Sequence, residues 1–163
     1  MKRRFHQLDV FSAAPLKGNP LAVVHDAAGL SEAAMADFAR WTNLSETTFL
    51  LAPTDPAADY RVRIFTPGGE LPFAGHPTVG SCHAWLVAGG VPREPGEVVQ
   101  ECGVGLVHIR RSVGHGWLLP HRPCDAPDRW MKRWCSASPQ AWAWRVPTCC
   151  STSGWTTALV GVP

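Results

Sequence analysis

The stretch Glu70-Leu71-Pro72-Phe73-Ala74-Gly75-His76-Pro77-Thr78-Val79-Gly80 decides how this chain folds. The apolar run that begins at Val79 and ends at Ala88 predicts a helix that is apolar on all sides and must be enclosed. Pro77 suits the first helical position, because its ring fixes φ and its missing N–H would have no partner there. Gly75 permits a tight turn and a close approach of the backbone to a ligand. We therefore predict that the helix amides and the positive end of the helix dipole form a small anion site.

Composition narrows the classes of protein to consider. The chain has 163 residues, which suits one domain or one domain and a fraction, and its net charge is only +2. That charge gives no electrostatic case for binding nucleic acid, and no run of about 18 apolar residues offers a membrane span. The basic start Lys2-Arg3-Arg4 is not followed by the apolar segment of a signal peptide. We therefore expect a cytoplasmic protein.

Motifs for cofactors and metals are missing from the sequence. It contains no nucleotide-binding loop, no flavin or pyridoxal lysine motif and no metal triad, so we predict no cofactor and no metal. The six cysteines show no CxxC or zinc-like spacing. We interpret them as free thiols of a reducing compartment, although their even number also permits disulfides.

The first 112 residues predict one domain of mixed helix and strand. Strands are expected at residues 5–11, 21–24, 46–51 and 60–65, and a hairpin joins 98–99 to 105–109. Ser31 suits the N-cap of a helix whose Ala34, Phe38 and Trp41 share one face. Gly89-Gly90 marks the end of the apolar helix.

Residues 113–163 differ in character from the first domain. They hold six of the eight tryptophans and four of the six cysteines, and no helical or strand period is sustained between Gly114 and Ser153. We interpret this segment as an irregular remnant of a second domain that is read out of frame from near Ser112. A genuine segment rich in tryptophan is the alternative. A strand pattern returns from Trp155 to Val160.

Three motifs carry a resemblance to a known family. They are Gly18-Asn19-Pro20-Leu21-Ala22-Val23, Asn43-Leu44-Ser45-Glu46-Thr47-Thr48-Phe49 and the stretch from Glu70 to Thr78, in this order. Together they make residues 4 to about 111 resemble the N-terminal half of the PhzF-like isomerases of phenazine biosynthesis. The resemblance implies an α+β fold like that of diaminopimelate epimerase, with a curved, mostly antiparallel sheet wrapped around a central apolar helix. It also implies two such domains with the active site between them.

The resemblance also implies roles for individual residues. Glu46 is the candidate catalytic acid/base, which moves a proton between carbon atoms of a small anionic substrate, and burial should raise its pKa. The backbone amides of Gly75 and His76 would stabilise the developing negative charge. Ser45 and Asn19 are candidates for substrate hydrogen bonds, and the His76 side chain for orienting the substrate or sharing the proton. Without the family resemblance, the sequence around Asn19 fits a turn residue equally well. The sequence around Glu46 then fits a solvated residue at a strand edge.

Two departures from the family bear on activity. Related racemases that use thiols have a cysteine just before the glycine that opens the helix, where this chain has Ala74, so carboxylate chemistry fits better. The acidic motif of the family's second domain has no counterpart here. We therefore expect an isomerase or epimerase impaired by truncation. The alternatives are a non-catalytic remnant that binds a small ligand, and a half-domain that pairs with a second copy as a homodimer.

The change of character near Ser112 makes a prediction about the gene. We expect that an alternative reading frame of the coding DNA, entered near the codon of Ser112, continues the apolar and charged patterns of the first domain. Sequencing of that region checks this. If neither alternative frame extends those patterns, the segment from residue 113 onward is a genuine part of the protein.

Overall fold

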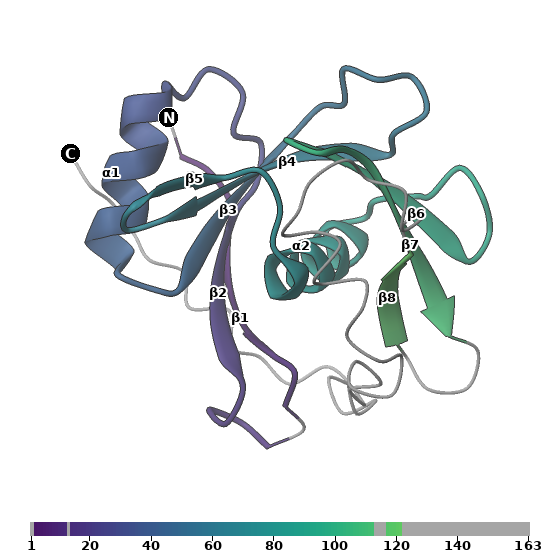
Figure 1. Cartoon of the computed structure of the whole chain (residues 1–163), viewed down its shortest axis with the longest axis horizontal. Helices are drawn as coiled ribbons and strands as arrows, with labels where there is room; N and C mark the ends of the chain where they lie inside the picture. Colours follow the sequence, from purple (N-terminus) through teal and green to yellow (C-terminus); the bar gives the residue numbers. More distant parts are fainter. Residues whose placement is uncertain (1, 13, 113–116, 122–163) are drawn as a thin grey trace.

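The structure is a computed structural model that describes residues 2–12, 14–112 and 117–121. In this part of the chain, eight strands form one sheet in the order β1-β2-β3-β4-β6-β7-β8, and β5 also pairs with β4 (Figure 1). The pairs β2–β3 and β4–β6 are parallel and the others antiparallel. The elements are β1 (Phe5–Val10), β2 (Asn19–Val24), α1 (Glu32–Thr42), β3 (Glu46–Leu51), β4 (Tyr60–Thr66), β5 (Gly69–Leu71), α2 (Gly75–Val87), β6 (Glu97–Cys102), β7 (Gly105–Ser112) and β8 (Trp117–His121). The predicted α+β class, with a mostly antiparallel sheet, is confirmed.

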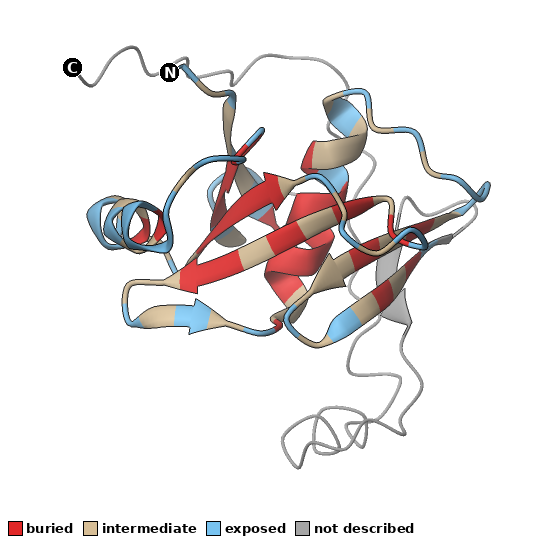
Figure 2. Cartoon of the chain, turned by 90° about the horizontal axis from the view of Figure 1, so that it is seen from above, coloured by how far each residue is buried: buried red, intermediate tan, exposed pale blue. Residues whose placement is uncertain are grey.

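Helix α2 lies inside the curve of the sheet, as its apolar sequence predicted. It contacts β1, β2, β3, β6 and β8, and Figure 2 shows buried residues concentrated on the helix and on the strands around it. The residues from His76 to Cys82 are all buried, whereas His83 and Val87 on the later turns are exposed. The enclosure is therefore tightest at the N-terminal end of the helix.

Gly80 allows this close packing of helix on sheet. A methyl group at this position would lie 2.9 Å from Cγ2 of Val10 and closer still to the side chain of Leu21. Both side chains belong to the apolar core between α2 and the sheet. Because the core is close-packed, neither can withdraw without disturbing its own neighbours.

Buried polar side chains also tie α2 to the strands. The Ser81 hydroxyl donates to Oγ1 of Thr48 on β3 at 2.9 Å. Gln100 on β6 donates through Nε2 to Oγ1 of Thr78 at 3.2 Å, and it accepts a 2.8 Å hydrogen bond from the hydroxyl of Tyr60 on β4. Buried groups of this kind are unfavourable unless they are paired, so these bonds fix where the first turns of α2 lie.

The start of α2 differs from the sequence prediction. The helix begins at Gly75, so Pro77 is its third residue and not its first. Proline is tolerated there because N–H groups of the first turn have no partner within the helix. The end agrees with the prediction, since Gly89 has φ of 97° and donates to the carbonyl of Leu86 at 3.0 Å.

Helix α1 covers the opposite face of the sheet. Ser31 caps it as predicted, and its hydroxyl accepts a hydrogen bond from the backbone N–H of Ala34 at 3.2 Å. The predicted face is wrong, because Trp41 is 71% exposed. The buried residues are Met35 and Ala39, which pack in a second core with Phe49 and other side chains. Alanines on several sides of this helix made its apolar period ambiguous.

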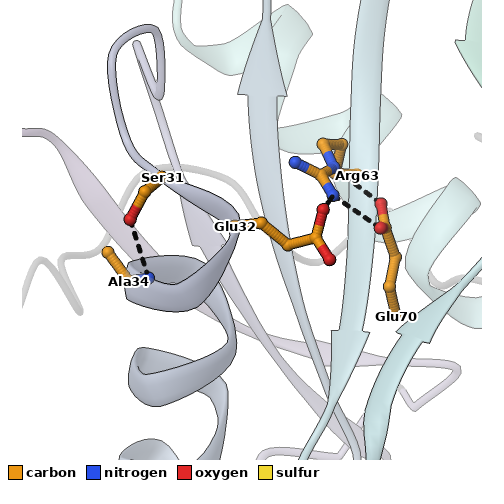
Figure 3. A network of polar contacts seen from close by, with 5 residues as sticks. All are labelled: Ser31, Glu32, Ala34, Arg63 and Glu70. Atoms are coloured by element: carbon orange, nitrogen blue, oxygen red, sulfur yellow. Dashed lines mark hydrogen bonds and ion pairs between the residues drawn. The ribbon is translucent and has the colours of Figure 1, made fainter.

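Arg63 joins α1 to two strands on this second face (Figure 3). Its guanidinium makes two hydrogen bonds of 2.6 Å to the Glu70 carboxylate on β5 and one of 2.9 Å to Glu32 at the start of α1. The pKa of Arg63 lies above its ordinary value, mainly because its side chain makes hydrogen bonds to Glu70. Glu70 on β5 is therefore tied to the neighbouring strand β4.

The sheet runs past the predicted domain boundary at residue 112. Strand β8 pairs with β7, with Ser112 opposite Trp117. The predicted strand at residues 155–160 and most of the segment 113–163 lie outside the described residues. Of the six cysteines, Cys82 and Cys102 lie in the described part, where Cys82 is a free thiol, and the others lie outside it. Neither described helix is long and apolar enough to cross a membrane.

The packing at Gly80 yields a prediction about stability. Gly80→Ala should lower the free energy of unfolding by about 1–3 kcal/mol, because the added methyl overlaps buried side chains. Chemical denaturation measures this. The matched control is Gly68→Ala, where the new methyl would meet only the Thr66 hydroxyl at an ordinary 3.6 Å. Equal stability of the two variants would show that α2 is not held as closely as described.

Candidate active site

The predicted site residues come together where β2, β3 and α2 begin. Strands β2 and β3 are parallel neighbours, with Leu21 opposite Glu46, so their N-terminal ends lie at the same edge of the sheet. Asn19 opens β2, and Ser45 and Glu46 stand at the start of β3. The first turn of α2, which contains His76, reaches the same edge, as the contacts below show. The site is thus built from segments that are distant in sequence.

Gly18 sets the position of Asn19. A side chain at residue 18 would collide with the carbonyl of Val10 and the carboxylate of Asp9, so only glycine fits this close approach. The Asp9 carboxylate also accepts a hydrogen bond from the backbone N–H of Lys17 at 3.2 Å. Close packing therefore requires the glycine of the Gly-Asn-Pro motif, and the motif places the Asn19 side chain in the site.

Glu46 is a largely buried carboxyl group beside a histidine. Its side chain is 17% exposed, and Oε2 lies 3.1 Å from Nδ1 of His76. This contact falls outside hydrogen-bond geometry, so Oε2 is buried without a hydrogen-bond partner among the described residues. Burial raises the pKa of Glu46 above its ordinary value. A carboxylate of this kind is a stronger base than one in water.

His76 is neutral at physiological pH. Burial lowers its pKa to about 4, although the nearby Pro20 carbonyl acts in the opposite sense. The contact with Glu46 is therefore not an ion pair near pH 7. Its second ring nitrogen, Nε2, is also buried and has no hydrogen-bond partner within the described ranges. Two polar atoms without partners in one site indicate a place where a ligand can bond.

The first turn of α2 presents backbone donors at the same place. Ala74, the N-cap residue, has extended backbone and provides no side-chain hydrogen bond to the helix. No acidic residue occupies the first turn. Among the described residues, no side-chain hydrogen bond caps the amides of Gly75 and His76, and no acidic residue within the first turn offsets the positive end of the helix dipole. This arrangement favours a negatively charged ligand.

Ser45 and Asn19 extend the set of contacts from His76. Nδ2 of Asn19 lies 3.3 Å from Nδ1 of His76, and the Ser45 hydroxyl donates to Oδ1 of Asn19 at 3.1 Å. The four predicted side chains, from Ser45 through Asn19 and His76 to Glu46, thus form one continuous series. Their order in space could not be read from the sequence.

One residue near the site was not anticipated. The Phe11 ring lies beside His76, with 6.2 Å between ring centroids. The sequence placed Phe11 at the end of the first strand, but β1 ends at Val10 and Phe11 turns with φ of 71°. A positive φ at a bulky residue is unusual, and nothing in the local sequence signals it.

Cys82 and His83 take no part in this site. Cys82 is fully buried, and burial raises the pKa of its thiol to about 12, so it is inert as a nucleophile. His83 is exposed on a later turn of α2.

Several known proteins are similar to this chain in sequence. The family described as "Phenazine biosynthesis-like protein" (PhzC-PhzF) matches residues 8–121. Antisense-enhancing sequence 1 of Schizosaccharomyces pombe is 53% identical over 105 residues, which cover 64% of this chain and 36% of that protein. The trans-2,3-dihydro-3-hydroxyanthranilate isomerase of Pseudomonas aeruginosa is 51% identical over 81 residues, or 50% of this chain and 29% of the isomerase.

A solved structure supports the same assignment. The crystal structure of the Bacillus anthracis phenazine biosynthesis protein of the PhzF family has a TM-score of 0.62 and 35% sequence identity, over 72% of this chain and 39% of that one. The chain thus spans between 29% and 39% of the length of these relatives. The resemblance inferred from the three motifs is confirmed, and the chain belongs to the PhzC-PhzF family of phenazine biosynthesis-like proteins.

Proposed function

We propose that this chain carries the acid/base part of a cofactor-independent isomerase or epimerase site. Glu46, as the carboxylate, takes a proton from one carbon of a small anionic substrate and returns it to another. The family and its isomerase relatives support an isomerase-type function. The single observation that carries the proposal is the buried Glu46 carboxyl beside His76 at the uncapped start of an enclosed helix.

The surroundings of Glu46 suit proton transfer at carbon. Removal of a proton from carbon leaves a carbanion or enolate, whose charge must be stabilised at once. The amides of Gly75 and His76 would donate to that charge or to a substrate carboxylate. The raised pKa of Glu46 brings the base closer to the working pH. His76 is neutral, so it places no positive charge on Glu46 that would weaken the base.

The substrate class follows from the same donors. Main-chain amides at a helix start favour a small carboxylic acid over an uncharged molecule. A dihydro-hydroxyanthranilate fits this description, and the P. aeruginosa relative is named for the isomerisation of such a compound. We take trans-2,3-dihydro-3-hydroxyanthranilate as the first substrate to test.

The alternative is a non-catalytic role. The chain spans about a third of the length of its relatives, and family members are expected to close the site with a second domain. Without a second wall, water would weaken the electrostatics of the site. This favours a half-domain that binds a small anion, or one that pairs with a second copy.

The first prediction concerns this chain alone. Incubated in D₂O with trans-2,3-dihydro-3-hydroxyanthranilate, it should show little or no isomerisation or deuterium incorporation by mass spectrometry. Robust turnover that disappears in Glu46→Gln would show instead that the chain is complete in function. Size-exclusion chromatography of the same sample separates an active dimer from an inactive monomer.

The second prediction tests Glu46 in a complete site. In a fusion protein, residues 8–121 replace the matching segment of the P. aeruginosa isomerase. Glu46→Gln in this fusion protein should lower kcat on the order of 10²- to 10⁴-fold, because the amide cannot accept the proton. The control is Glu94→Gln, which alters an exposed glutamate. A Glu46→Gln rate equal to that of the control would remove Glu46 from the chemistry.

The third prediction is the pH dependence of the fusion protein. Glu46 must be ionised to accept a proton, so kcat/KM should fall as the pH drops through its pKa. Burial raises that pKa, so the fall should begin at a higher pH than an exposed glutamate would give. His76, with a pKa of about 4, should add no inflection near pH 6.5. An acid limb at the ordinary glutamate value, near 4.3, would contradict this.

A further inference from the structure

The hydrogen-bond partners of His76 bear on which of its ring nitrogens carries the proton. The Ser45 hydroxyl donates to Oδ1 of Asn19 at 3.1 Å. With Oδ1 occupied in this way, the Asn19 amide turns Nδ2 toward Nδ1 of His76 at 3.3 Å. In this orientation of the amide, its NH₂ group can only donate, so Nδ1 accepts. A neutral imidazole has one N–H, and the ring proton then resides on Nε2.

The position of Glu46 agrees with this assignment. Its Oε2 lies 3.1 Å from the same Nδ1 but outside hydrogen-bond geometry. Asn19 therefore meets Nδ1 with hydrogen-bond geometry, whereas Glu46 does not. Nε2 is buried and has no hydrogen-bond partner in the described part of the chain. A buried N–H in this state is available to a ligand.

We propose that Ser45 and Asn19 are positioning residues that hold His76 as the Nε2–H tautomer. Nδ1 is then an acceptor beside Glu46, and Nε2 presents its proton to the bound substrate. This inference deepens the proposed function and rests on it for the meaning of the site. It assigns Asn19 and Ser45 to the orientation of His76, where the sequence had them as direct substrate ligands.

The tautomer matters because it controls the strength of the base. An Nδ1–H group facing Glu46 would donate to the carboxylate, stabilise its ionised form and lower its pKa. An acceptor at Nδ1 gives no such stabilisation, and Glu46 keeps its affinity for a proton. Ser45 and Asn19, which do not touch the Glu46 carboxylate in any described hydrogen bond, would thus set its basicity through the imidazole.

Imidazole NMR of the chain as it stands tests the proposal without substrate. The protein carries ¹⁵N-labelled histidine and is measured at pH 7, where His76 is neutral. Two-bond ¹H–¹⁵N correlations should show a protonated Nε2 and an unprotonated Nδ1 for His76. A wild-type spectrum with the proton on Nδ1, donated to Glu46 or to the Pro20 carbonyl, overturns the proposal.

Three variants sharpen the test. Asn19→Asp puts a carboxylate in place of the amide donor, so the His76 proton should move to Nδ1. Ser45→Ala frees the Asn19 amide to turn, and the spectrum should shift toward a mixture that contains Nδ1–H. Ser45→Thr keeps a hydroxyl and should retain the wild-type pattern. If Asn19→Asp fails to fold, as judged by circular dichroism, the Ser45 pair still decides, because equal spectra for alanine and threonine would overturn the proposal.

A matched control and a second readout separate positioning from general damage. Asn43→Asp makes the same chemical change at the exposed C-cap of α1 and should leave the His76 signals unchanged. The pKa of Glu46, followed by the ¹³C shift of its carboxyl carbon, should fall in Ser45→Ala but not in Ser45→Thr or Asn43→Asp. An unchanged Glu46 pKa together with a moved proton would overturn the link to basicity. The NMR result stands whether or not Glu46→Gln inactivates the fusion protein, so failure of the proposed function is seen separately.

Discussion

The enclosure of α2 is the constraint on which the rest of the structure depends. Strands surround the first turns of this helix, so each polar group there needs a partner inside the protein. Thr78 is hydrogen-bonded to Gln100, and Ser81 is hydrogen-bonded to Thr48. These bonds fix the depth of the helix against the sheet and its rotation about its own axis. Gly80 lets the sheet come close on the remaining side. The backbone amides at the start of α2 are thereby held rigidly at one point of the sheet edge.

Burial has the same chemical effect on two side chains at that point, Glu46 and His76. It raises the pKa of Glu46 and lowers that of His76, and in both residues it favours the uncharged form. Such a site holds a basic carboxyl group and a neutral imidazole beside backbone amides that favour a negatively charged ligand. With both side chains uncharged, the negative charge in the site would come from a substrate anion. Burial of these two groups, although unfavourable for folding, can therefore be useful for binding.

Local signals in the sequence predicted much of the fold. The apolar run after Gly75, the Ser31 cap and the hairpin that joins 98–99 to 105–109 depend on neighbouring residues, and the structure contains all three. The face of α1 was wrong because alanines blurred its period. The contact of Glu46 with His76 depends on the parallel register of β2 and β3 and on the depth of α2, neither of which short-range patterns encode. The three family motifs indicated that proximity, but the order of Ser45, Asn19 and His76 and the turn at Phe11 needed coordinates.

The sheet keeps two sets of side chains apart along the same strands. On β3 and β4, Leu50 and Ile64 pack toward α2, whereas Phe49 and Phe65 pack toward α1, where Arg63 bridges Glu32 and Glu70. Alternate positions of one strand therefore belong to different cores, one packed against α2 and the other against α1. A substitution on the α1 face therefore acts first on the second core, whereas one on the α2 face acts on the core that encloses the helix of the candidate site.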